Sequence, residues 1–389
     1  MNQPASSAES GVAERLAGYL RQDPHNPGLL ADACDAALAA GLHALAQEHM
    51  DTAASLALEP VAWSLRRARM CIAQRRLDEA AGVLQALQAT QGAHPALAHD
   101  LAYVRLLQGA TQACRELLAP WLATDATLLE PQTLEGLQVL WLRATHRLQL
   151  LEEAWHWARQ QLAQGRLQAA ACGVASLVAL DTSRFDDARM LSEYALGERP
   201  AQIEALVARA GVALADRDTA RAVLLLERAL QCNPEDGRTW SALGLCSLQA
   251  QQLPQAQARF ERALRGLPGH VGTWHALGWC RLLQQDSAGA LAAFHQALEL
   301  DRNFAESHGA VGLALVLAGD QAQAEPYLEL ARRLDPANLT GRYARALLAG
   351  ETRDVQRLLA LADRLLDRPG FGRGRLSESV RSAVGPLGK

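Results

Sequence analysis

Lysine is almost absent from this chain of 389 residues, because the only one is Lys389, the final residue. A P-loop needs a lysine on the phosphates, a protein kinase needs one on its third strand, and Schiff-base chemistry needs a buried one. The sequence therefore excludes these three classes. It also lacks H-E-x-x-H and G-x-S-x-G motifs, and we predict a non-catalytic protein without catalytic residues, cofactor or metal.

Long apolar runs and paired cysteines are also missing. No stretch of 18 apolar residues occurs, so we predict no membrane span. The first 20 residues lack a basic start followed by an apolar run, and we expect no signal peptide. The seven cysteines form no C-x-x-C motif and no closely spaced Cys/His set, which predicts buried free thiols. Unpaired thiols are typical of a reducing compartment, so we predict a cytoplasmic protein.

Charge is nearly balanced, with a formal net charge of −4 and a pI near 6.3. No overall field would attract nucleic acid, and we predict no nucleic-acid partner. The ends differ in sign: residues 1–60 hold eight acidic and two basic residues, and residues 351–389 hold eight basic and five acidic residues. Weak self-association through these ends is one possible consequence, and plain solubility is the other. Ala, Leu and Arg dominate the composition, which indicates a GC-rich bacterial genome.

One set of residues, which we call the framework, recurs along the chain with a period of 34 residues. The residues Trp240, Leu243, Gly244, Ala256, Phe260 and Ala263 recur as Trp274, Leu277, Gly278, Ala290, Phe294 and Ala297. One period later stand Val311, Gly312, Ala324, Leu328, Ala331 and Pro336, and earlier periods contain Ala210, Ala222, Leu226, Ala229 and Pro234, then Ala188, Ala195 and Pro200. A fixed period of this length predicts a solenoid.

Each period predicts two helices. The first covers about 238–250, with an apolar stripe at helical spacing. Pro254 stands where a second helix would begin, a position that tolerates its missing N–H. Gly244 is expected to let the paired helices approach, with the large side chains of Trp240 and Phe260 in the core beside it. No unit can bury its stripe alone, so neighbouring units must stack.

These residues resemble the tetratricopeptide repeat (TPR) family, whose 34-residue helix–turn–helix has Trp, Leu-Gly, Ala, an aromatic residue, Ala and Pro at these offsets. The resemblance implies an all-α, right-handed superhelical solenoid of antiparallel helix pairs. We predict a short N-terminal helix and linker at 1–27, degenerate helix pairs at 28–134, the TPR array at 135–336, capping helices at 337–368 and a flexible tail at 369–389.

Irregularities in the framework are the candidate partner-binding residues. Residues after the Leu-Gly pair face the inner surface in a TPR stack, which predicts an apolar strip of Leu245, Trp279 and Leu313. His275 and Ser241 are placed on the same face. Further back, Arg143, His146 and Arg147 form a basic patch. An exposed apolar strip is typical of a protein-binding surface, and a peptide or amphipathic helix would suit it. Packing between repeats is the alternative, as is occupation by the chain's own C-terminal helix.

The leading functional hypothesis is a scaffold or adaptor that binds a protein or peptide ligand in its concave groove. A secretion- or assembly-type chaperone for one client is the first alternative, and a helical-repeat RNA-binding protein is the second and weaker one. The carboxylate clamp of TPR co-chaperones needs Asn and Lys on the inner helices. Its residues are missing here, because Leu245, Trp279 and Leu313 stand after the Leu-Gly positions and lysine is absent.

Overall fold

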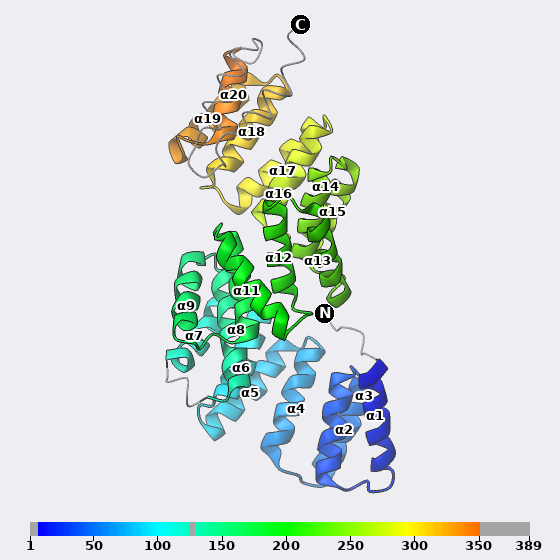
Figure 1. The fold of residues 1–389 in the computed structure, drawn as a ribbon. Coiled ribbons are helices and arrows are strands. Elements are labelled where there is room, and N and C mark those ends of the chain that lie inside the picture. Colours follow the sequence, from blue (N-terminus) through cyan, green and yellow to red (C-terminus); the bar gives the residue numbers. More distant parts are fainter. Residues whose placement is uncertain (1–6, 124–128, 351–389) are drawn as a thin grey trace. The chain divides into compact units, whose positions relative to one another are not determined.

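The computed structural model describes residues 7–123 and 129–350, and all regular structure in these residues is α-helical (Figure 1). Two compact units divide the chain after Ala215. The helices of the first unit are α1 Ser7–Leu20, α2 Pro27–Ala39, α3 His43–Ser55, α4 Pro60–Ala73, α5 Leu77–Gln91, α6 Pro95–Leu107, α7 Thr111–Ala123, α8 Pro131–Arg147, α9 Leu151–Ala163, α10 Ala169–Asp181, α11 Phe185–Glu198 and α12 Ile203–Ala215.

The second unit begins with α13, and its described part ends at Gly350. Its helices are α13 Thr219–Cys232, α14 Gly237–Gln249, α15 Leu253–Gly266, α16 Val271–Leu283, α17 Ser287–Leu300, α18 Ala305–Leu317, α19 Gln321–Leu334 and α20 Leu339–Leu348. Within each unit, consecutive helices pair and the pairs stack, so both units are α-solenoids. The all-α solenoid predicted from the sequence is confirmed.

In each of nine turns between helices of the described chain, one residue has a positive φ, that is, a left-handed backbone conformation. Such residues are Gly41, Arg75 and Gly109, and then Gln149, Ser183, Arg217, Gln251, Gln285 and Gly319. Consecutive members of each series are 34 residues apart, whereas the step from Gly109 to Gln149 is 40. At Gln285 the backbone forms a Schellman motif, in which Gln285 N–H donates to Leu282 and Asp286 N–H donates to Arg281. The repeat therefore keeps one phase up to α7 and another from α8 on.

Glycine allows the two helices of a pair to approach closely. A Cβ added to Gly244 would come closer than 3.0 Å to the Phe260 ring, and one added to Gly278 would come equally close to the Phe294 ring. Gly312 meets Leu328 in the same way one period later. Phe260 and Phe294 are fully buried. The predicted role of glycine in this framework is thus confirmed.

The expectation that the framework tryptophans lie in the core is wrong, because Trp240 and Trp274 are only partly buried. Each indole N–H donates a 2.8 Å hydrogen bond to the proline carbonyl six residues earlier, Pro234 and Pro268 respectively. A tryptophan placed across the entry of its helix keeps one ring edge polar, which explains the residual exposure. His308 holds the next equivalent position, and its Nε2 lies 2.8 Å from the Arg302 carbonyl, again six residues earlier.

All seven cysteines lie in the described residues as free thiols, and all but Cys232 are buried. Burial raises the pKa of the Cys34 and Cys114 thiols to about 11 and that of Cys172 to about 12. Protonated thiols of this kind pack as small apolar groups. The prediction of buried free thiols is confirmed for six of the seven cysteines.

The ends of the array can be compared with the predicted segments. The short helix expected within 1–27 is observed as α1, and the helix pairs expected within 28–134 begin with α2 and α3. Pro60 begins α4, since proline is favoured in the first turn of a helix. In the segment 337–368, expected to hold capping helices, the structure has α20. The remainder of that segment from residue 351 on and the tail expected at 369–389 lie outside the described residues.

Candidate partner-binding cleft

Two adjoining cavities in the first unit form the candidate site, which we call the α8–α11 cleft. The larger, of about 490 Å³, is lined by Pro131, Gln132, Glu135, Gln168, Ala169, Tyr194, Glu198 and Arg199. The smaller, of about 300 Å³, is lined by His99, Tyr103, Gln132, Glu135, Gly136, Val139, Leu140, Arg143, Ala170 and Arg199. They share Gln132, Glu135 and Arg199, so the side chains between Glu135 and Arg199 form their common boundary.

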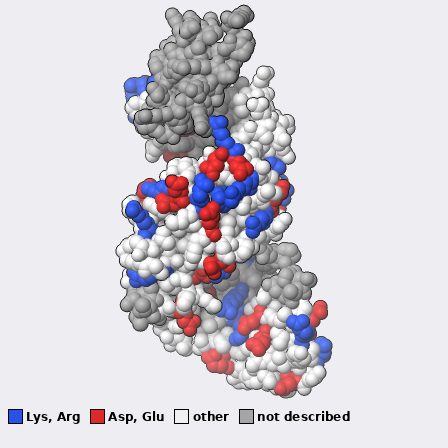
Figure 2. All heavy atoms as spheres, viewed as in Figure 1, with Lys and Arg blue, Asp and Glu red and all other residues white. Residues whose placement is uncertain are grey.

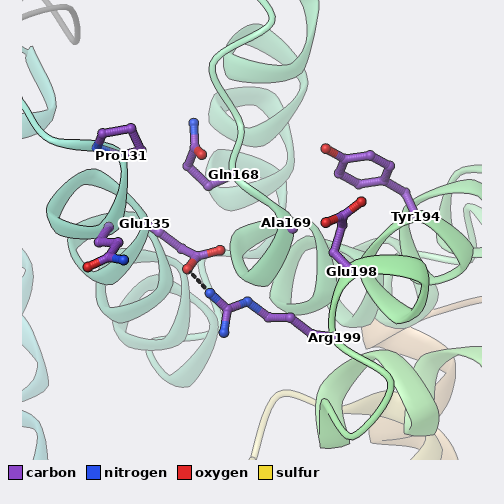
Figure 3. Close-up of a pocket in the computed structure, with 8 residues that line it drawn as sticks. Pro131, Glu135, Gln168, Ala169, Tyr194, Glu198 and Arg199 are labelled. Carbon is purple, nitrogen blue, oxygen red and sulfur yellow. Dashed lines mark hydrogen bonds and ion pairs between the residues drawn. The ribbon is translucent and has the colours of Figure 1, made fainter.

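Glu135 organises this boundary from α8. One carboxylate oxygen accepts a 2.9 Å hydrogen bond from the backbone N–H of Ala170, in the first turn of α10. The other accepts from the guanidinium of Arg199, which follows α11 (Figure 3). The carboxylate thus satisfies a free N–H of α10 and sits at the positive end of that helix. Three elements are held together by one side chain that is largely buried.

Tyr194 and Glu198 form the opposite wall of the larger cavity. They are four residues apart on α11, so they lie on the same face of the helix. Figure 3 shows the Glu198 carboxylate turned toward the Tyr194 side and the Arg199 guanidinium turned away toward Glu135. Tyr194 is 55% exposed, which is unusual for a large aromatic side chain inside a cavity. No ion pair involves Glu198 among residues 7–123 and 129–350.

A second ion pair, of reversed polarity, links the same repeats. Arg143 of α8 donates from Nε to Glu204 of α12 at 2.8 Å, reaching past α10. Gly173 on α10 makes room for a further long side chain: the amide of Gln202 lies where a Cβ of Gly173 would be and donates to the Ala170 carbonyl at 2.7 Å. The two ion pairs, Glu135–Arg199 and Arg143–Glu204, therefore connect α8 to residues beyond α10.

The side chains of the predicted basic patch contact other residues of the first unit. The patch consists of Arg143, His146 and Arg147. Arg143 pairs with Glu204, and it alone of the three lines the cleft. His146 is buried, with Nε2 2.7 Å from the Asp181 carboxylate. Arg147 donates to the Leu106 carbonyl at 3.2 Å. The expectation of a patch that turns three cationic groups toward a ligand is wrong for His146, because this side chain is buried against Asp181 of the next repeat.

The predicted apolar strip of the second unit is exposed only in part. Leu245 is 40% exposed and Trp279 is partly exposed, but Leu313 is only 2% exposed. The Trp279 ring packs edge-on against Phe294 with 5.7 Å between centroids. The expectation of one continuous exposed strip is therefore wrong at Leu313, where the neighbouring helices cover the side chain.

Ser241 and His275 are buried and join adjacent repeats. The Ser241 hydroxyl lies 2.8 Å from the Thr273 hydroxyl, and His275 Nε2 lies 2.8 Å from the Ser307 hydroxyl. Both contacts join residues 32 positions apart, so they are the same contact in successive repeats. Burial lowers the pKa of His275 from 6.5 to about 4, which keeps the ring neutral. The role of these two residues is packing between repeats, since neither presents a surface to a ligand.

The lining of the cleft combines polar, aromatic and apolar side chains. In the described part of the chain, His, Cys, Asp and Glu side chains form no group that could hold a metal ion. Within the same ranges, none of the helices has the length and apolar character needed to cross a membrane. Figure 2 shows basic and acidic side chains interspersed on the visible face, with wide uncharged areas between them.

Little in the sequence indicated the residues of the cleft. Tyr194 and Glu198 stand between the framework positions Ala188, Ala195 and Pro200, where the period places no requirement. The pairing of Glu135 with Arg199 joins residues 64 apart, and that distance is not visible from a 34-residue period. A usable signal was a tyrosine outside the framework, four residues before a glutamate near the end of a predicted helix.

Comparison with known proteins identifies the class of repeat. One tetratricopeptide repeat family matches residues 213–277, and a second matches residues 32–95 and 174–237. No curated protein matches the chain. Together with the helix pairs, the glycine contacts and the 34-residue phase, these matches show that residues 32–95 and 174–277 contain tetratricopeptide repeats. TPR families are in general non-catalytic modules that bind other proteins.

Several solved structures are similar in fold. A crystal structure of MamA is 16% identical over 41% of this chain and 92% of its own, with a TM-score of 0.35. YrrB, described as a TPR protein with an unusual peptide-binding site, is 17% identical over 48% of this chain and 96% of its own, with a TM-score of 0.36. Pseudomonas aeruginosa PilF is 20% identical over 56% of this chain and 99% of its own, with a TM-score of 0.43.

Proposed function

We propose that this TPR protein is a non-catalytic scaffold that holds a peptide segment of a partner protein in the α8–α11 cleft. The observation that supports the proposal is the cleft itself, whose two cavities carry exposed tyrosines at their walls, Tyr103 and Tyr194. Tyrosine offers a large, rigid contact area with a polar tip, and it is enriched among the residues that dominate binding energy. Gln132 adds an amide group suited to pairing with a peptide backbone, whereas the Gln168 amide already donates to the Arg166 carbonyl at 3.2 Å.

A non-catalytic role is consistent with the chemistry of the cleft. The carboxylate of Glu135 is occupied by Arg199 and by the α10 backbone, so it is held as a structural acceptor. His99 lies beside Asp100, with 3.0 Å between Nδ1 and the carboxylate, and the described lining residues of the two cavities include no Ser, Thr, Cys or Lys nucleophile. An activated nucleophile needs a base within hydrogen-bond distance.

A second candidate surface keeps part of the strip predicted from the sequence. Leu245 and Trp279 retain exposed apolar area in the second unit, and a helix of a partner or an aggregation-prone client would cover it. A chaperone role would rest on this surface. We expect a cytoplasmic location, which the six buried free thiols favour, and no nucleic-acid partner.

A photo-crosslinking amino acid placed at native aromatic positions tests the proposal in cells of the source organism. Replacement of Tyr103 and of Tyr194 should each give an adduct with the same partner protein. Tyr19, which is 57% exposed and lies on α1, is the matched control and should give none. A partner trapped from Trp279 but from neither tyrosine of the cleft would favour the second surface. Equal adducts from all positions would contradict a defined site.

Substitution measures the contribution of the same residues to affinity. We expect Tyr103→Ala combined with Tyr194→Ala to weaken the crosslinked partner's binding by ~2 kcal/mol or more, because exposed aromatic anchors dominate interfaces of this kind. The matched variant is Leu245→Ala combined with Trp279→Ala, measured with the same partner. Loss of binding in the second variant alone would overturn the assignment of the cleft.

A further inference from the structure

The larger cavity of the α8–α11 cleft carries one carboxylate for which the described residues provide no ion-pair partner. Three charged side chains line it, Glu135, Glu198 and Arg199. Glu135 and Arg199 neutralise each other in an ion pair, and the remaining charge of this lining is that of Glu198. A neighbouring carboxylate on the same helix, Glu193, is treated differently, since it pairs with Arg209 at 2.8 Å. The cavity is therefore acidic at its α11 wall.

The surroundings of Glu198 favour a cation. Tyr194, one turn earlier, offers the face or edge of an exposed ring, and a cation over a tyrosine face is attracted by the ring quadrupole. Glu198 is the last residue of α11, where the free carbonyls of the final turn add partial negative charge. The opposing positive end of α10 is already occupied, because Glu135 accepts the Ala170 N–H. Arg199, the next residue along the chain, is directed to Glu135 (Figure 3).

We propose that the Tyr194–Glu198 corner of this cavity receives an arginine or lysine side chain of the partner's peptide. The inference rests on the proposed function and adds the chemistry of the residue that is recognised. The cationic head would contact the Glu198 carboxylate while its alkyl stem lies along the Tyr194 ring, which suits a long side chain with an apolar stem. The volume of about 490 Å³ accommodates such a side chain together with part of the peptide backbone.

The Glu135–Arg199 pair sets the strength of this site. As long as Glu135 holds Arg199, the arginine does not compensate Glu198; without the arginine charge, the Glu135 carboxylate would be uncompensated and the cavity more negative. Removal of the Arg199 charge should therefore strengthen binding of a basic peptide, and removal of the Glu198 charge should weaken it. An acidic partner residue would instead use Arg199 and Arg143, and both effects would reverse in sign.

The probe is a series of short fluorescent peptides that differ only in one central residue, Arg, Lys, Gln or Glu, titrated against the full chain. We expect the Arg and Lys peptides to bind more tightly than the Gln peptide, and the Glu peptide to bind most weakly. Glu198→Gln should weaken the Arg peptide about threefold to fivefold, the range of exposed charge pairs. Arg199→Gln should strengthen it by about threefold, and both effects should shrink at high salt.

The matched controls separate the cation site from peptide binding as such. Tyr194→Phe keeps the ring and should leave the preference for Arg unchanged, whereas Tyr194→Ala should reduce it. If all four peptides bind equally, or if Glu198→Gln and Arg199→Gln change nothing, the cation site is wrong while peptide binding stands. If Glu198→Gln strengthens peptide binding and Arg199→Gln weakens it, the cleft recognises an acidic residue instead. If no peptide binds the unmodified chain and no crosslink forms at Tyr103 or Tyr194, the proposed function fails as well.

Discussion

The two units use the same repeat for different purposes. In the second unit, successive repeats make the same contacts, such as Gly244 with Phe260 and Gly278 with Phe294, and Ser241 with Thr273 and His275 with Ser307. In the first unit, the contacts around α10 are not periodic, because they join α8 to residues near α12 through two ion pairs of opposite polarity. Periodic contacts maintain the stack, and aperiodic polar contacts form the cleft.

The largest expected effect tests the periodic packing. Phe294→Ala should lower the free energy of unfolding by about 3–5 kcal/mol, since it removes a fully buried ring and leaves a cavity beside Gly278. Urea unfolding followed by tryptophan fluorescence would measure it. Phe294→Leu is the control, because Leu328 fills the same position one period later. A loss as large for leucine as for alanine would show that the position requires an aromatic ring.

Closing the space at glycine should cost less. Gly278→Ala places a Cβ closer than 3.0 Å to the Phe294 ring, and we expect a loss of about 1–3 kcal/mol in unfolding free energy from overpacking. Gly269→Ala is the matched control, because no atom of the described residues lies within 4 Å of its added Cβ. Thermal unfolding of both variants measures the difference. Equal stability of the two would mean that the paired helices can move apart freely.

The buried histidine makes the second unit sensitive to acid. Burial lowers the pKa of His275 to about 4 in the folded protein, while the unfolded chain has a pKa near 6.5. Between these values the unfolded chain binds more protons, so this contribution to stability is complete above about pH 6.5 and is lost as the pH falls toward 4. At pH 5 the loss should be about 2 kcal/mol.

His275→Gln isolates that contribution, because glutamine keeps a hydrogen-bond group near Ser307 and does not titrate in this range. Urea unfolding of both proteins at pH 7 and pH 5 gives the comparison. The difference between the two pH values should be smaller in the variant by the expected amount. An unchanged pH dependence would mean that the ring is protonated in the folded state or that another group dominates.

The smallest expected effect concerns the stability of the cleft. Arg199→Gln should change the free energy of unfolding by less than about 1 kcal/mol, because the arginine is half exposed and water screens the pair. The same substitution is expected to alter peptide binding, so the cleft would separate stability from recognition. Chemical denaturation beside the peptide titration measures both. A large loss of stability would instead make the ion pair a structural element of α10.

The fold was predictable from the sequence because packing within each repeat requires a residue of a certain size at each framework position. Phe260 must face Gly244, and only a small residue permits that contact at the observed separation. The position of a residue in the repeat does not determine its burial, however. Leu313 and Leu245 hold the same position in their repeats, but Leu313 is 2% exposed and Leu245 is 40% exposed. The difference comes from which helices cover each residue.

The cleft was not predictable from the sequence for a related reason. Glu135 and Arg199 lie 64 residues apart, close to two periods, and nothing in the sequence around either residue marks the other as its partner. The phase change between Gly109 and Gln149 also hid the earlier repeats, because subtracting multiples of 34 from the later framework places every position up to α7 six residues out.

The left-handed turn residues also offer sites at which substitution could raise the thermal stability of the protein. Glycine occupies the position at Gly41, Gly109 and Gly319, whereas six other repeats place a side chain there, at Arg75, Gln149, Ser183, Arg217, Gln251 and Gln285. A residue with a Cβ is strained in this conformation by roughly 1 kcal/mol, and glycine is not. Natural selection has thus left the same small strain in most of its turns. Six glycine substitutions, each far from the Tyr194–Glu198 corner in sequence or outside its lining, offer a route to a more stable protein with an intact cleft.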